Sequence, residues 1–459
     1  MNAGLLTVVP ARGPAFARRL ALLEARGERA SAAVERQVRA IIEAVRRRGD
    51  AAVFAYTRRF DGVSLSARTV EVPPAAMARA EAALPPDVRR ALGLAARRIR
   101  AFHRRQRQSS WSFRDASGAR LGQQVRPLDR VGVYIPGGTA AYPSSVLMNV
   151  IPAKVAGVGE VIGVTPAGRG GVPDAVLAAA RIAGIDRLFR IGGAQAVAAL
   201  AYGTRLVPRV DKICGPGNIY VATAKRLVFG TVDIDMIAGP SEVLIVADAA
   251  ANPVLVAADL LSQAEHDPLA AAILVTPSAA LARKVEDELG TQLAHLPRHA
   301  IARRALRRHG TVFVTTSVAE AVALANRLAP EHLELMVRRP ERWLGAIRHA
   351  GAIFLGEHAP EPFGDYLAGP NHVLPTGGSA RFSSPLGVYD FIKRSSVIAA
   401  SPRTLSLLGP AVMRLARLEG LDAHAMAVGY RLGLAQPTMG ADPTGRPGLT
   451  PGREAHREA

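Results

Sequence analysis

Short apolar runs that alternate with helix-like segments are the feature that most constrains the fold of this 459-residue chain. From Arg130 onward each run ends in Gly, Pro or another turn former. Most runs are followed by a segment whose apolar residues recur at three- and four-residue spacing. The runs are residues 131–135, 161–164, 188–191, 210–213, 243–246, 272–275, 312–314 and 352–355. This alternation predicts βαβ units, in which helices cover both faces of parallel sheets.

The number and spacing of the runs favour an α/β fold with two Rossmann-like parallel-sheet domains. A closed barrel fits less well, because the spacing is uneven and residues from about 30 to 125 are expected to be mainly helical. A chain of this length also exceeds what one hydrophobic core usually supports. The expected parts are an N-terminal segment (1–29), a discontinuous first α/β domain (30–130 and 244–385), an inserted second one (131–243), a small helical C-terminal unit (386–436) and a disordered tail (437–459).

The formal charge of +20 raises the question of nucleic-acid binding. The densest basic run, residues 98–107, has helical spacing and a single phenylalanine, so a solvated helix face explains it better. The single cysteine, Cys214, excludes a disulfide framework and a multi-cysteine metal site. Neither a long uncharged apolar stretch nor a secretion signal is recognisable, so we expect a cytoplasmic protein that binds neither nucleic acid nor membranes.

Glycine-rich loops follow two of the expected strands, where parallel sheets commonly bind ligands beyond the strands' carboxyl ends. Residues 135–138 (IPGG) and 215–218 (GPGN) each precede a helix and can bring backbone N–H groups close to a phosphate. Tight turns alone explain these glycines equally well. The dinucleotide motif G-x-G-x-x-G is absent, since Gly157-x-Gly159 is followed by Gly163 and leads into a strand.

Two pairs of polar residues have a sequence spacing that suits metal binding or proton transfer. Gln263 and His266 lie three residues apart at the end of an expected helix and can share a metal ion, although a surface histidine is the plainer interpretation. Glu331 and His332 place a carboxylate beside an imidazole, which suits proton transfer near neutral pH but also occurs by chance. Asp365 lies in an irregular loop, where it can ligate a metal or cap a turn.

Three other residues have plain interpretations when each is considered alone. Glu419 and His424 flank the segment GLDA and are expected at the surface. Cys214 ends an expected strand, and packing explains it better than a nucleophilic role.

Eight ordered segments together resemble the histidinol dehydrogenase family. They extend from about Arg130 to His424, with a weaker match before that. The segments are VGVYIPGGTAAYPSSVLMNVIPAKVAGV, IGGAQAVAALAYGT, VDKICGPGNIYVATAKR, DMIAGPSEVLIVAD, DLLSQAEHDP, LAPEHLEL, PFGDYLAGPNHVLPTGGSARF and EGLDAH.

The resemblance implies a zinc- and NAD-dependent oxidation of L-histidinol to L-histidine through L-histidinaldehyde. It assigns one Zn²⁺ per subunit to a set of nitrogen and oxygen donors that needs no thiolate. The implied ligands are Gln263, His266, Asp365 and His424. The implied cofactor-binding residues are Tyr134, Gln195 and Asn218.

The resemblance also implies roles in catalysis and substrate binding. His332 is expected to take the alcohol proton during hydride transfer, and Glu331 is expected to activate the water that attacks the aldehyde. The implied substrate contacts are Ser241, Gln263, His266, Glu331, His332, Asp365, Glu419 and His424. A homodimer of intertwined subunits is implied as well, with Glu419 and His424 reaching the neighbour's site.

Two alternatives stay open at this point. A related zinc- and NAD-dependent enzyme with another polar alcohol as substrate, such as a sulfonated diol, would share most of these residues. Ser241 and Glu419 favour histidinol, because a carboxylate suits a cationic amino alcohol. A basic nucleic-acid-binding protein with a decayed enzyme fold is the other alternative, and the intact set of implied ligands argues against it.

Overall fold

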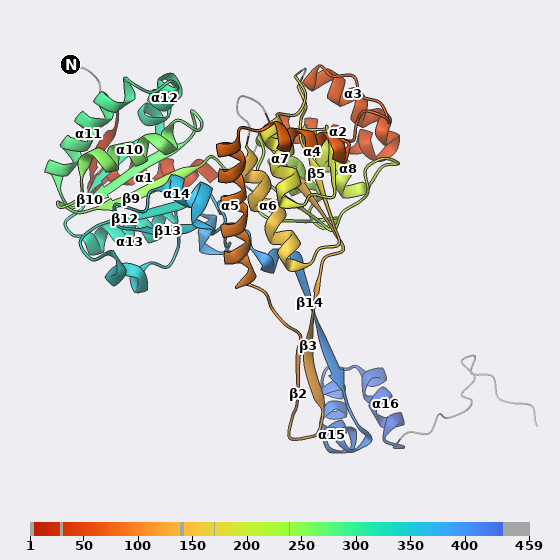
Figure 1. Ribbon diagram of the computed structural model, residues 1–459. Helices are drawn as coiled ribbons and strands as arrows, with labels where there is room; N and C mark the ends of the chain where they lie inside the picture. Colours follow the sequence, from red (N-terminus) through yellow and green to blue (C-terminus); the bar gives the residue numbers. More distant parts are fainter. Residues whose placement is uncertain (1–3, 28–30, 138–141, 169, 238, 435–459) are drawn as a thin grey trace, which may run out of the picture. The chain divides into compact units, whose positions relative to one another are not determined.

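The computed structural model describes residues 4–27, 31–137, 142–168, 170–237 and 239–434 (Figure 1). Contacts divide the chain into two compact units. Unit 1 consists of Met1–Arg107 and Arg126–Lys393, and unit 2 of Gln108–Val125 and Arg394–Ala459. The tail expected at 437–459 and Gly138 of the first glycine-rich loop lie outside the described residues.

A six-stranded parallel sheet forms one half of unit 1, in the order β1-β11-β10-β9-β12-β13. Its strands are β1 (Thr7–Pro10), β9 (Glu242–Ala247), β10 (Ala271–Thr276), β11 (Thr311–Val314), β12 (His332–Met336) and β13 (Ala352–Leu355). Alternate residues of β9 point into two separate apolar cores, which explains its unbroken apolar sequence. One core contains α10 (Pro253–Ala264), α11 (Ala279–Leu293) and α12 (His299–His309), and the other contains α1 (Gly13–Glu24) and α13 (Val318–Leu328).

A five-stranded parallel sheet forms the other half, in the order β6-β5-β4-β7-β8. Its strands are β4 (Arg130–Tyr134), β5 (Glu160–Val164), β6 (Arg187–Phe189), β7 (Lys212–Cys214) and β8 (Asp233–Ile234). One face packs against α4 (Pro74–Ala83), α5 (Pro86–Arg104), α6 (Pro143–Ala156) and α7 (Asp174–Ala183). The other packs against α2 (Ala32–Arg48), α3 (Asp50–Asp61), α8 (Gly193–Tyr202) and α9 (Ile219–Val228).

The two open parallel sheets confirm the expected fold class, and each of the eight apolar runs overlaps a strand. Helices α2 to α5 pack on the second sheet, whereas the expected boundaries grouped residues 30–130 with the first domain. The domain boundaries themselves stay a prediction, because both sheets belong to one compact unit.

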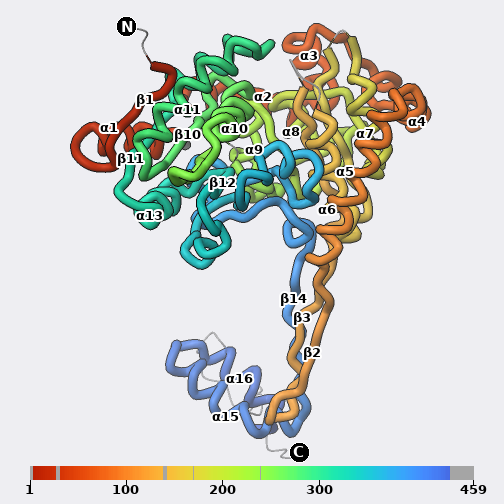
Figure 2. The backbone as a smooth tube through the Cα atoms, turned by 60° about the vertical axis from the view of Figure 1, so that its left-hand side comes forward, coloured from red at the N-terminus to blue at the C-terminus, as the bar shows by residue number. Residues whose placement is uncertain are grey.

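Unit 2 joins two stretches of chain that are far apart in the sequence. The hairpin of β2 (Trp111–Arg114) and β3 (Arg120–Pro127) pairs with β14 (Ile392–Ala399) in the order β14-β3-β2 (Figure 2). Helices α15 (Pro402–Leu418) and α16 (Asp422–Arg431) follow and pack on each other. The Thr404 hydroxyl, next to the Ser401 cap of α15, donates to the Ser117 carbonyl at 3.0 Å and ties the helix to the hairpin.

The hairpin was not expected at the end of the stretch 30–125, which is otherwise mainly helical, and β14 is an unexpected strand at the start of the helical C-terminal unit. These strands are mostly exposed or half-buried and so lack the apolar alternation of a strand that lies on a core. Within the described part of the chain, no helix has both the length and the apolar character needed to cross a membrane.

Candidate active site

The candidate catalytic pair lies at the amino end of β12, beside the amino end of the neighbouring strand β9 in the six-stranded sheet. Glu331 precedes β12, His332 is its first residue, and His332 is in register with Val243 of β9. Ser241 immediately precedes β9. This placement corrects the expectation that the chemistry gathers at carboxyl ends. Amino ends of strands also offer free backbone groups, and here the N–H of Glu242 is available to a side chain.

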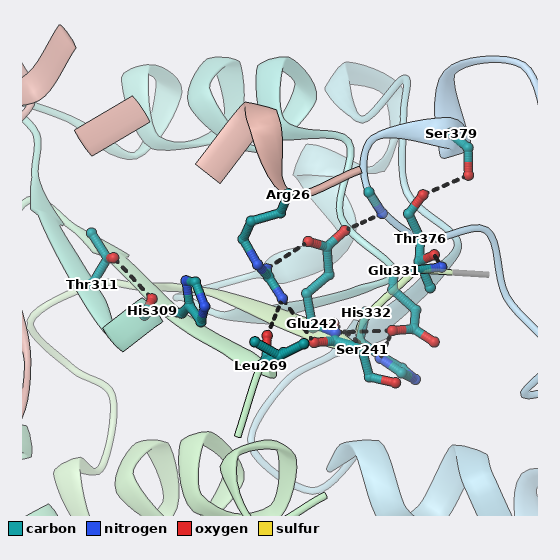
Figure 3. Close-up of polar contacts among 12 residues, drawn as sticks. Arg26, Ser241, Glu242, Leu269, His309, Thr311, Glu331, His332, Thr376 and Ser379 are labelled. Atoms are coloured by element: carbon teal, nitrogen blue, oxygen red, sulfur yellow. Dashed lines mark hydrogen bonds and ion pairs between the residues drawn. The ribbon is translucent and has the colours of Figure 1, made fainter. Parts of the chain in front are cut away.

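The Glu242 backbone contacts both members of the pair (Figure 3). Its N–H donates to Glu331 Oε2 at 2.9 Å, and its carbonyl lies 3.2 Å from His332 Nδ1. Because a carbonyl only accepts, Nδ1 carries the proton and Nε2 of the neutral ring keeps a lone pair. His332 Nε2 is buried without a hydrogen-bond partner, so this nitrogen is available as a base.

A group of metal-ligating side chains lies beside this pair. His266, Glu361 and Asp365 each offer a ligand atom, and these atoms all lie within 4.8 Å of one another. His266 follows α10, Glu361 begins α14 (Glu361–Phe363), and Asp365 lies in the π-helical turn η3 (Gly364–Ala368). Asp365 Oδ1 is 3.6 Å from His332 Nε2, so the group and the pair form one site.

The donor set fits a divalent cation. Both amide atoms of Gln263, in the last turn of α10, are buried without a hydrogen-bond partner. A buried amide without a partner is costly, and a metal ion would satisfy its oxygen. Imidazole, amide and carboxylate donors of this kind suit Zn²⁺. The structure therefore brings His266 and Asp365 together and leaves Gln263 with free donor atoms near the end of the same helix.

Two residues of this region were missed from the sequence. Glu361 belongs to the ligand group, and its spacing of four residues before Asp365 is the signal that was available. His372 donates from Nδ1 to the backbone carbonyl of Asp365 at 3.0 Å, and no sequence spacing indicated this contact.

Burial and neighbouring charges shift the titration of the site. Burial raises the pKa of Glu331 to about 7 and that of Glu361 to about 8. Burial alone would lower the pKa of His332, but the carboxylates of Glu361, Glu331 and Asp365 outweigh it and raise that pKa well above the ordinary value. A bound cation would favour the ionised carboxylates and the neutral imidazole, which is the state a proton acceptor needs.

Glu419 and His424 belong to unit 2, whereas all residues named so far in this site belong to unit 1. Glu419 is the C-cap residue that follows α15, and His424 lies in α16. Both side chains are exposed within their unit, as expected for surface residues.

The three candidate cofactor residues gather near the carboxyl edge of the five-stranded sheet. Tyr134 ends β4, and its buried hydroxyl accepts the Gly193 N–H at the start of α8 at 3.0 Å. Gln195 lies in the first turn of α8, and both of its side-chain amide atoms are buried without a partner. Asn218 caps α9 by accepting the N–H groups of Tyr220 and Val221. Tyr134 and Asn218 therefore have structural roles here, and Gln195 has free donor and acceptor atoms.

A buried ion pair supports the second glycine-rich loop. Lys225 of α9 pairs with Asp235, and both residues also bind the backbone of Gly215. The Lys225 ammonium donates to the Gly215 carbonyl at 2.9 Å, and the Gly215 N–H donates to the Asp235 carboxylate at 2.7 Å. Gly215 has a φ of 106°, and a Cβ at this position would collide with the Tyr134 carbonyl. The preceding Cys214 is fully buried in the core, as the packing interpretation predicts.

Replacing Lys225 with methionine is expected to lower the free energy of unfolding by about 3–5 kcal/mol, because Asp235 would remain buried without its counter-ion. Urea denaturation followed by circular dichroism measures this change. Lys284→Met on an exposed face of α11 is the matched control and should shift stability by less than about 0.5 kcal/mol. Equal stability of the two variants would show that the Lys225–Asp235 pair does not support the fold.

Comparison with known proteins agrees with this arrangement. The family model described as histidinol dehydrogenase matches residues 24–432. Histidinol dehydrogenase from Syntrophotalea carbinolica is 58% identical over 417 residues, 91% of this chain and 97% of the relative. The enzyme of that name from Aquifex aeolicus is 55% identical over 414 residues, 90% of this chain and 96% of the relative.

A solved structure of a histidinol dehydrogenase has a similar fold. The crystal structure of histidinol dehydrogenase from Elizabethkingia anophelis matches with a TM-score of 0.89 and 35% sequence identity. The match covers 94% of this chain and 99% of that one. The chain belongs to the histidinol dehydrogenase family.

Proposed function

We propose that this protein catalyses the NAD-dependent, zinc-requiring oxidation of L-histidinol to L-histidine through L-histidinaldehyde, the last steps of histidine biosynthesis. The observation that carries the proposal is the buried Glu331–His332 pair, which lies beside the ligand group of His266, Glu361 and Asp365 in a chain of this family. The overall change converts one alcohol, two NAD⁺ and one water into a carboxylate, two NADH and three protons.

The reaction needs a metal ion that holds the substrate and a hydride acceptor, and protein side chains provide neither. We assign the metal to Gln263, His266 and Asp365, with His424 from unit 2 as the fourth ligand, and Glu361 lies close enough to the group to contribute. A bound Zn²⁺ would hold the nitrogen atoms of the substrate and fix its orientation. NAD would accept the hydride in each oxidation, and we place it near Tyr134, Gln195 and Asn218.

The Glu331–His332 pair divides the proton transfers. In the first oxidation His332 Nε2 removes the proton from the alcohol oxygen as the hydride leaves the same carbon. In the second, Glu331 removes a proton from the water that attacks the aldehyde carbon. The buried position of both groups supports these roles, because a raised carboxyl pKa near neutrality suits a general base.

Substrate recognition extends beyond the pair. We infer that Ser241, at the amino end of β9, and Glu419 contact the substrate, Glu419 through its charge. We further propose a homodimer in which Glu419 and His424 complete the neighbouring subunit's site. Exposed apolar side chains on unit 2, including Ile398, Leu407 and Leu418, support an interface there. The use of NAD in a biosynthetic step supports a cytoplasmic location.

Counting NADH against histidinol consumed tests the function. The purified protein is expected to form two NADH per L-histidinol, to lose this activity on chelation, and to regain it with Zn²⁺ but not with Mg²⁺, which suits oxygen ligands better. A sulfonated diol serves as the competing substrate. Turnover of the diol without turnover of histidinol would overturn the named substrate while keeping the reaction type.

A further inference from the structure

Arg26 connects the N-terminal part of the chain to the amino end of β9. It lies in the short 3-10 helix η1 (Ala25–Gly27), and its side chain is only 6% exposed. The guanidinium contacts Glu242 Oε2 at 3.1 Å, the Leu269 carbonyl at 2.7 Å and the Ser241 carbonyl at 3.4 Å (Figure 3). One cation thus joins a side chain and two backbone groups that are more than 200 residues away in the sequence.

The partner of Arg26 is the residue whose backbone orients the catalytic pair. The Glu242 N–H donates to Glu331 and its carbonyl accepts from His332 Nδ1, as described above. The Glu242 carboxylate is itself held from two sides, by Arg26 and by the Gly377 N–H at 3.1 Å. Movement of this one residue would therefore shift both reacting groups together.

Packing alone does not fix this end of the strand. A cavity of about 250 Å³ adjoins it, lined among others by Glu242, Pro330 and Gly377. Side chains beside a cavity are not held by close packing on that side, so their position depends on polar contacts. Glu242 is nevertheless 7% exposed, which makes an unpaired charge there costly.

We propose that Arg26 is a positioning residue for the oxidation. By holding the Glu242 carboxylate and the Ser241 carbonyl, it fixes the backbone that keeps Glu331 in place and His332 in the tautomer with a free Nε2. Arg26 does not touch the reacting atoms. The proposal rests on the function proposed above, because it concerns the efficiency of that reaction.

The test must separate positioning from simple charge pairing. Arg26→Met alone leaves Glu242 without its counter-ion and can unfold the protein, so the decisive variant is Arg26→Met with Glu242→Gln, which has no unpaired charge. We expect kcat for histidinol to fall about 10- to 100-fold, because small displacements of reacting groups have effects of this size. KM should change less than threefold, and the zinc and NAD content should stay at the wild-type level.

Arg19→Met is the matched control. Arg19 also reaches from the N-terminal part to the same sheet, where it binds Thr311 Oγ1 at 2.8 Å and the Gly310 carbonyl at 2.9 Å, but it contacts neither Glu242 nor the catalytic pair. We expect this variant to lose stability and keep kcat. Arg26→Lys retains the charge and should recover part of the activity that the double variant loses.

Hydrogen exchange gives a readout that does not depend on activity. The amide of Glu242 should exchange faster in the double variant than in the wild type, measured by mass spectrometry on a peptide that spans 236–247, in which Glu242 lies well after the peptide's first two residues. Wild-type kcat with unchanged exchange in the double variant would overturn the positioning role, as would a change confined to KM. A wild-type protein that forms no NADH from histidinol would overturn the function instead, and the exchange experiment would still decide whether Arg26 holds the strand end.

Discussion

Glu331→Gln is expected to yield an enzyme that oxidises histidinol to the aldehyde and then stalls. The glutamine amide oxygen can still accept the Glu242 N–H, so the strand end should stay in place. The amide cannot take a proton from water, and the second oxidation should slow by about 10²- to 10⁴-fold. A single-turnover experiment with excess NAD should therefore show about one NADH per histidinol in the fast phase, where the wild type forms two.

The variant His332→Gln tests whether His332 acts in the first oxidation and Glu331 in the second. His332→Gln should slow the first oxidation itself, so NADH should form slowly from the start and no aldehyde should accumulate. Glu71→Gln, a change in a partly exposed ion pair with Arg187 of β6 in the five-stranded sheet, is the control and should behave as the wild type. Two rapid NADH equivalents from Glu331→Gln would show that another group activates the water.

Mixing two nearly inactive variants is expected to restore activity if the C-terminal unit completes the neighbour's site. His332→Gln damages unit 1 and His424→Asn damages unit 2, and each alone should retain only a small fraction of the wild-type activity. In a mixed dimer one site receives both intact units and the other receives both damaged ones. With random exchange of subunits, activity should reach about one quarter of the wild type, since half of the dimers are mixed and each has one working site.

The control for mixing pairs two variants of the same unit. A combination of Glu331→Gln and His332→Gln should not recover the complete two-step oxidation, because every site then lacks one member of the pair. Dimers that carry two different affinity tags can be purified to test the mixed species directly. Mixed His332→Gln/His424→Asn dimers without activity would mean that each chain completes its own site.

The sheets were predictable from the sequence because most of the expected strands are buried on both faces. All eight strands expected from unbroken apolar runs are present, and two sheets formed instead of a barrel. The strand that carries His332 was missed. In β12 the sequence HLELM places Glu334 in the middle, and this side chain is 1% exposed and accepts the Glu361 N–H at 2.9 Å. A buried carboxylate interrupts the apolar run on which strand recognition depends.

Most catalytic and metal-binding residues of the site could be proposed from sequence motifs, whereas Arg26, which holds the strand end beside them, could not. Glu331, His332, His266 and Asp365 stand in recognisable segments and lie together in unit 1. Arg26 has no local signal, because its partners are distant in sequence and one basic residue among 58 carries no information about what it contacts. The hairpin of β2 and β3 was missed for a related reason: its partner strand β14 lies far along the chain.

The edge strand β1 has a consequence for how the protein is made. Among the described strands Thr7–Pro10 pairs with β11 alone, whose residues Thr311–Val314 leave the ribosome about 300 residues later. At typical rates of synthesis this delay is about 15–60 s, during which the first residues of the chain have no strand to join. The five-stranded sheet, whose strands all lie between Arg130 and Ile234, can form meanwhile. We therefore expect the half of unit 1 that begins the chain to be the last to close during translation.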